Sequence, residues 1–152
     1  MKKILVASDH AGFALKGKLK VYLKAKGLSV SDLGTDSPES CDYPLFARDL
    51  ARKISKTASH RGILICKSGI GNSIVANRFS GVRAALCYSI KAARLAREHN
   101  DSNVLVLGSA FTNEDLAKRI LNAWLKTKFL GGRHKRRIKI ISKIEKEIRI
   151  RR

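Results

Sequence analysis

Short apolar runs alternate with helical segments from one end of this chain to the other. The apolar runs cover residues 4–7, 28–33, 63–66, 83–87 and 104–107. Each is followed by apolar side chains at helical spacing, such as Leu15, Leu19 and Leu23 after the first run. Five such units predict an α/β fold in which helices cover both faces of a parallel sheet.

The architecture expected from this pattern is a Rossmann-like three-layer αβα sandwich with a five-stranded parallel sheet. Residues 34–44 form the longest predicted loop, and the helix after the last strand is expected to open at Thr112. A chain of 152 residues without repeats or linkers predicts one domain, residues 1–152, with a C-terminal helical tail over residues 131–152.

The first residues resemble the opening of a signal peptide, but Ser8, Asp9 and His10 interrupt the apolar run after residues 4–7. A run this short is expected neither to direct secretion nor to cross a membrane, which predicts a cytoplasmic protein. Three cysteines without CxxC spacing cannot all pair, so reduced thiols are expected. Two of them, Cys41 and Cys87, are interpreted as structural.

The chain is strongly basic, with 32 Lys and Arg against 12 Asp and Glu. The resulting charge of +20 attracts phosphorylated small molecules and nucleic acids alike. The basic residues are scattered and few aromatic residues lie between them. This distribution favours a solvated basic surface over a dedicated nucleic-acid site.

The third apolar run ends in a loop that is suited to bind anions. Residues 63–65 are followed by Cys66 and then by Ser68, Gly69, Ile70, Gly71 and Asn72. A strand that breaks into a glycine-rich turn and a helix directs successive backbone N–H groups at one point. The predicted anion site therefore carries a thiol, whose alternative reading is a small buried core residue.

Polar side chains gather where the predicted strands end. In a parallel sheet the carboxyl ends of the strands meet at one edge. The residues expected there are Asp9, His10, Tyr43, Cys66 and Ser68, of which Tyr43 lies in a predicted loop. His99 and Asn100 instead precede a strand, so we expect them to reach this edge from a neighbouring subunit.

A series of motifs in one collinear order resembles type B ribose 5-phosphate isomerase, a family related to the galactose 6-phosphate isomerase subunits. They are SDHAG at residues 8–12, DYP at 42–44, GILIC at 62–66, SGIG at 68–71, EHND at 98–101 and GGRH at 131–134, followed by Arg137. The resemblance implies aldose to ketose isomerisation of a phosphorylated pentose in the pentose phosphate pathway, through an enediolate and without a metal or organic cofactor.

The resemblance assigns roles to the residues of the thiol loop. It implies that Cys66 is the base that moves the C2 proton, with Ser68 hydrogen-bonded to it. A helix N-terminus and nearby cations are expected to lower the pKa of the thiol. Backbone N–H groups around Gly69, Gly71 and Asn72 would hold the oxyanion, although these residues could also form a plain strand-to-helix turn.

The resemblance also implies that His99, assisted by Asp9, opens the sugar ring. The alternative is a surface histidine near a helix end. The substrate-binding residues implied beside the thiol loop are His10, Tyr43, Asn100, Arg133, His134 and Arg137. His10, Arg133, His134 and Arg137 would hold the phosphate. The alternative interpretation of these residues is a solvated basic face. Tyr43 would contact sugar hydroxyls or anchor its own loop.

Two positions depart from the family pattern. Lys67 stands where glycine is expected, which requires either a negative φ or a strained loop. Ala110 stands where a phosphate-binding arginine is expected. Lys67 could restore the positive charge, but strand alternation points its side chain away from the thiol. These departures bear on affinity and substrate identity and keep open an isomerase of hexose 6-phosphates such as allose or galactose 6-phosphate. The basic charge of the chain keeps open a second alternative, a protein that binds polyanions or nucleic acid on the same fold.

The tail after Gly132 resumes helical spacing. Ile138, Ile141, Ile144 and Ile148 fall on one stripe with Ile140 beside it. A helix that follows a complete five-unit domain has little core left to cover. We therefore expect this stripe to pack on a second copy, in a homodimer or homotetramer with active sites at the interface.

Overall fold

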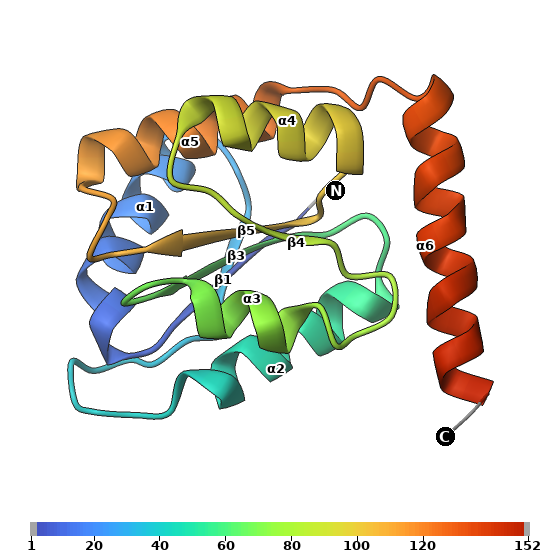
Figure 1. The fold of residues 1–152 in the computed structure, drawn as a ribbon. Coiled ribbons are helices and arrows are strands. Elements are labelled where there is room, and N and C mark those ends of the chain that lie inside the picture. The colour runs from blue at the N-terminus through green and yellow to red at the C-terminus, as the bar shows by residue number, and fades with distance from the viewer. Residues whose placement is uncertain (1–2, 151–152) are drawn as a thin grey trace.

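The computed structural model describes residues 3–150 and shows the predicted five-stranded parallel sheet (Figure 1). Its strands lie in the order β2-β1-β3-β5-β4, so β3 is central and β2 and β4 form the edges. The strands are β1 (Ile4–Ser8), β2 (Val30–Asp32), β3 (Arg61–Cys66), β4 (Ala84–Leu86) and β5 (Val104–Gly108). Part of the predicted tail, Arg151 and Arg152, and the first two residues of the chain lie outside the described residues.

Helices cover both faces of the sheet and complete the predicted three layers (Figure 1). One layer contains α1, α4 and α5, and the other contains α2 and α3. The helices are α1 (Phe13–Ala25), α2 (Tyr43–Lys56), α3 (Ile70–Ala76), α4 (Ile90–Asn100), α5 (Glu114–Lys126) and α6 (Gly132–Ile150), with a short 3-10 helix, η1 (His10–Gly12), after β1. None of the helices within residues 3–150 combines the length and apolar character needed to cross a bilayer.

Strand alternation divides the core between the two faces. Ile63 and Ile65 point toward the layer of α1, α4 and α5, and pack with Trp124, which is 0% exposed. Leu64, between them in sequence, points toward α2 and α3. Burial on both faces is typical of a parallel sheet and explains why its strands are almost continuously apolar.

Two element boundaries differ from the prediction. Helix α2 begins at Tyr43, so Tyr43 belongs to the first turn of this helix and not to the preceding loop. Pro44 does not oppose this start, because the first turn of a helix needs no backbone donor there. Helix α5 is capped by Asn113, not by Thr112: the Asn113 side chain accepts from the N–H of Leu116 at 2.9 Å.

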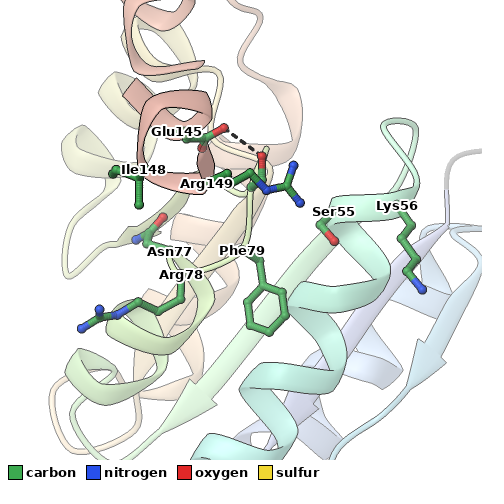
Figure 2. Close-up of a pocket in the computed structure, with 9 residues that line it drawn as sticks. Ser55, Lys56, Asn77, Arg78, Phe79, Glu145, Ile148 and Arg149 are labelled. Carbon is green, nitrogen blue, oxygen red and sulfur yellow. Dashed lines mark hydrogen bonds between the residues drawn. The ribbon is translucent and has the colours of Figure 1, made fainter. Parts of the chain in front are cut away.

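Helix α6 lies outside the three layers (Figure 1). It begins at Gly132 directly after Gly131, and the φ angles of these two residues, 53° and 69°, are in the left-handed region that favours glycine. Glu145 connects it to the α3–β4 turn, accepting from Ser80 Oγ at 3.2 Å (Figure 2) and from Gly81 N at 3.1 Å. A cavity of about 650 Å³ remains beside this contact, lined by Ser55, Lys56, Asn77, Arg78, Phe79, Ser80, Glu145, Ile148 and Arg149.

An ion pair between a buried lysine and a more exposed aspartate connects α1 to the edge strand β2. The Lys16 ammonium, whose side chain is 2% exposed, lies 2.9 Å from Asp32 Oδ1 and also donates to the Thr35 carbonyl. Lys20 donates to the other carboxylate oxygen at 2.6 Å. Burial opposes ionisation of Asp32, but the hydrogen bonds from the two lysines outweigh it and lower the pKa of this carboxyl.

We predict that Asp32→Ala lowers the free energy of unfolding by about 3 kcal/mol, because it leaves the buried Lys16 ammonium without its carboxylate. The control is Glu114→Ala, which removes the exposed pairs with Lys18 and Lys118 and is expected to cost below about 1 kcal/mol. Urea titration measures both values. The double variant Lys16→Met/Asp32→Ala should recover much of the loss, and equal costs for the two single variants would contradict the prediction.

Candidate active site

The candidate thiol lies at the carboxyl end of the central strand. Cys66 is the last residue of β3 and is 4% exposed. Gly69, with a φ of 82°, turns the chain so that its N–H donates to Cys66 Sγ at 3.1 Å. A side chain at Gly69 would also meet Leu86, 2.4 Å from the position of its Cβ. Glycine is therefore required at this turn for both its conformation and its size.

The expected lowering of the pKa of Cys66 is wrong. Burial raises the pKa of this thiol, and the backbone N–H groups of Gly69, Asn72 and Ser68 compensate only in part. The charge that acts on it within this chain is the carboxylate of Asp9, which raises the pKa further. Helix α3 is only seven residues long, and the expected cations do not offset the burial. At neutral pH the thiol of the single chain is therefore protonated.

Ser68 does not have the expected hydrogen bond to Cys66 within the described residues. Its Oγ accepts instead from the N–H of Ile70 at 3.2 Å, which stabilises the start of α3. Lys67 is exposed, and Asp101 is the only non-glycine residue of positive φ in residues 3–150, so Lys67 occupies the loop without backbone strain. The Lys67 carbonyl accepts from the N–H of Ala110 at 3.0 Å, which places the two departures from the family pattern side by side.

Helix η1 brings the end of β1 to the same edge. The Asp9 carboxylate is 5% exposed and accepts from Gly12 N at 3.1 Å. Gly12 lies so close to β3 that an added Cβ would be 2.6 Å from the Ile65 carbonyl oxygen. The His10 ring is held by the loop before α2, with Nδ1 3.1 Å from Cys41 N. Asp9 and His10 thus join Cys66, as expected for the carboxyl ends of neighbouring strands.

Tyr43 completes this edge from the other layer. Its ring lies against Gly71, where an added Cβ would be 2.3 Å from Tyr43 Cζ. The structure therefore brings Tyr43 to the thiol loop, where it packs on the loop's backbone. Asn72 is buried, at 2% exposure, one residue further along α3. Gly69 and the first turn of α3, with Gly71 and Asn72, thus lie on the same rim as Cys66, together with Asp9, His10 and Tyr43.

The other predicted site residues lie on the opposite side of the sheet, toward the amino ends of β4 and β5. The Asn100 carbonyl accepts from Arg83 Nε at 3.0 Å, and Arg83 directly precedes β4. His99 stacks on His134 of α6, with ring centroids 4.2 Å apart and planes 8° from parallel. Partial burial, His99 and the nearby arginines lower the pKa of His134. Arg133 and Arg137 are exposed on the same helix.

One residue near the thiol loop was not predicted from the sequence. Tyr88, which follows β4, donates its hydroxyl to the Ser68 carbonyl at 2.6 Å. Its position after a strand of the sheet was the available signal, because candidates were predicted after the first three strands. Among residues 3–150, no cluster of three His, Cys, Asp or Glu side chains could hold a metal ion.

Comparisons with known proteins agree with this arrangement. The profile of the Ribose/Galactose Isomerase family matches residues 4–141. Ribose-5-phosphate isomerase B of Escherichia coli K12 is 45% identical over 145 residues, which are 95% of this chain and 97% of that protein. Ribose-5-phosphate isomerase B of Clostridium thermocellum has a structure with a TM-score of 0.94 at 45% identity, covering 96% of this chain and 99% of that one.

A further similar structure is that of Mycoplasma genitalium ribose-5-phosphate isomerase B with bound ribulose-5-phosphate. Its TM-score is 0.93 at 44% identity, over 95% of this chain and 97% of that one. This chain is thus a Rossmann-like α/β protein with its candidate site at the carboxyl ends of the strands. It belongs to the Ribose/Galactose Isomerase family, which confirms the resemblance found in the sequence.

The thiol environment predicts how Cys66 reacts with iodoacetamide as the pH changes. Because only the thiolate reacts and burial raises the pKa of the thiol, alkylation of Cys66 should increase with pH to a midpoint above that of a free cysteine. Asp9→Asn should lower this midpoint, since it removes the negative charge while its amide oxygen can still accept from Gly12. Mass spectrometry of the Cys66 peptide separates it from Cys41. A midpoint below that of a free thiol would contradict this prediction.

Proposed function

We propose that this protein interconverts ribose 5-phosphate and ribulose 5-phosphate in the pentose phosphate pathway. The observation that carries the proposal is the Cys66 thiol at the edge of the sheet, beside the Gly69 N–H and the Asp9 carboxylate. Membership in the Ribose/Galactose Isomerase family and the bound sugar of the Mycoplasma genitalium structure support the choice of a phosphorylated sugar.

The reaction requires a proton to move from C2 to C1 and another from the C2 oxygen to the C1 oxygen. Cys66, as thiolate, takes the C2 proton and returns it to C1 from the same face. The enediolate formed between these steps carries negative charge on oxygen. The backbone N–H groups around Gly69, Gly71 and Asn72 stabilise that charge, because they are held in place before the reaction begins.

The remaining roles belong to the residues near the amino ends of β4 and β5, and we propose that a second copy supplies them. His99 of that copy, with Asp9 of the first, opens the furanose ring. Asn100 contacts the sugar, and Arg133, His134 and Arg137 hold the phosphate with His10. Cations brought to the rim in this way would also offset the burial that raises the pKa of Cys66.

The surface of α6 supports assembly into a homodimer, or a homotetramer built from it. Ile141, Ile144 and Ile148 are 40%, 48% and 52% exposed, which is unusual for isoleucines on one helix of a folded protein. Cavities of about 650 and 430 Å³ lie along the same helix. A second copy that covers the isoleucines would bury this apolar surface.

The sugar specificity follows from the length of the substrate that fits between thiol and phosphate site. We propose a pentose 5-phosphate, and the alternatives are allose and galactose 6-phosphates. A turnover panel across these three substrates distinguishes them, with ribose 5-phosphate expected to give the highest kcat/KM. Absence of turnover together with strongly salt-dependent RNA binding would favour the polyanion binder instead.

We predict that Cys66→Ala reduces ribose 5-phosphate turnover more than tenfold, because the thiolate acts on the reacting proton and not in ground-state binding. Exchange of the C2 proton with deuterated water should be lost to the same extent. Binding of a non-reactive pentitol 5-phosphate, measured by calorimetry, should stay near that of the wild type. The control is Cys87→Ala, which removes a buried thiol from the layer of α1, α4 and α5. If Cys66→Ala kept more than a tenth of the wild-type activity, Cys66 would not be the base.

The shared site predicts complementation between two inactive variants. When Cys66→Ala and His99→Ala are mixed under subunit exchange, heterodimers should form about half of the population and hold one intact site of two, which restores about a quarter of the activity. Mixing Cys66→Ala with Asp9→Ala is the matched control, because both residues belong to the same rim of one chain and no intact site can form. Confirmed exchange without recovery in the first mixture would show that the site is not shared.

A further inference from the structure

We propose that Tyr88 is a positioning residue that holds the Ser68–Gly69 peptide with its N–H directed at the Cys66 sulfur. The hydroxyl of Tyr88 donates to the Ser68 carbonyl at 2.6 Å, and the Gly69 N–H donates to Cys66 Sγ at 3.1 Å. These two groups belong to one peptide unit. Tyr88 therefore acts on the thiol through a single rigid plane of atoms.

The carbonyls of the thiol loop are each held, but in different ways. The Cys66 carbonyl accepts from Ser109 N at 2.9 Å, and the Lys67 carbonyl accepts from Ala110 N at 3.0 Å. Both donors are backbone groups, so they do not depend on the side chain at those positions. The Ser68 carbonyl accepts instead from a side chain, and the residue type at position 88 therefore decides whether the third contact exists.

The third contact matters because the peptide that it holds has conformational freedom. Gly69 has a φ of 82°, and glycine can also adopt the opposite sign at small cost. Rotation of the Ser68–Gly69 peptide would turn the carbonyl toward the sulfur and the N–H away from it. Gly108 leaves space for the carbonyl in its present orientation, since an added Cβ there would be 2.4 Å from Ser68 O. The Tyr88 hydroxyl favours this orientation.

The ring of Tyr88 is itself supported. It packs on Phe111, from the loop after β5, with ring centroids 5.3 Å apart and an angle of 56° between the planes. Such a tilted arrangement is favourable for aromatic pairs. Tyr88 and Phe111 are 41% and 62% exposed, so the pair lies on the surface beside the thiol loop. Neither ring is needed to fill the core. The pair instead holds the Tyr88 hydroxyl against the Ser68 carbonyl.

The contact also affects the charge on sulfur. A donor on the Ser68 carbonyl polarises the peptide and strengthens its N–H as a hydrogen-bond donor. A stronger donor stabilises the thiolate relative to the thiol. Among residues 3–150, the charged group that acts on the sulfur is Asp9, from the β1–η1 connection, and it acts in the opposite direction. Tyr88 thus opposes Asp9 and the burial of the thiol.

The test is Tyr88→Phe, which removes the hydroxyl and keeps the ring on Phe111. The pH midpoint for alkylation of Cys66 by iodoacetamide should rise by about half to one unit, as expected for the loss of one polarised hydrogen bond. Alkylation needs no substrate, so this result is independent of the proposed function. Tyr22→Phe, which removes a hydroxyl from α1 and leaves the thiol loop unchanged, is the control and should leave the midpoint at its wild-type value.

The kinetic part rests on the proposed function. With ribose 5-phosphate at pH 7, Tyr88→Phe should lower kcat about fivefold with KM nearly unchanged, and the loss should shrink as the pH rises. An unchanged alkylation midpoint would overturn the inference, whether or not kcat falls. A shifted midpoint in a protein whose wild type has no isomerase activity would support the role of Tyr88 and refute the proposed function. Equal thermal unfolding midpoints for both variants and the wild type establish that the fold is retained.

Discussion

The pairing between β3 and β5 continues past the last residue of β3, and the position of the candidate thiol depends on it. Ser109 and Ala110 donate to the carbonyls of Cys66 and Lys67, so the first part of the loop is held by backbone hydrogen bonds from the segment that follows β5. The strand behind it is fully buried, with Ile63 to Ile65 at 0% exposure. A loop fixed in this way keeps its N–H groups in place without help from a ligand, which is the condition for electrostatic stabilisation of an enediolate.

The layers of the fold could be predicted because they follow from periodicity. Apolar runs that alternate with helical spacing define a parallel sheet covered on both faces, and the structure has this arrangement. The ends of elements depend instead on single hydrogen bonds. Asn113 and Thr112 are both good caps by residue type, and only the geometry of the loop decides that Asn113 accepts from Leu116. The strand order also has no signal in a single sequence.

The rim around Cys66 could be predicted for the same reason, since the carboxyl ends of parallel strands meet at one edge. The protonation of the thiol could not, because it is a balance between burial and the charges in three dimensions. The sequence shows many cations but not that Asp9 is the charge beside the sulfur. It shows Tyr88 as one exposed aromatic residue, and nothing in it indicates that the hydroxyl reaches a carbonyl 20 residues earlier in the chain.

The burial of Cys66 has a consequence for the lifetime of the protein. Peroxide oxidises the thiolate of a cysteine, first to a sulfenic acid and then irreversibly to higher acids. Burial raises the pKa of the Cys66 thiol in the single chain, so the thiol is protonated at rest and offers peroxide little of the reactive form. The same features that slow the formation of a base therefore protect it between turnovers, so the protein can use a cysteine where an exposed thiolate would be consumed by oxidative stress.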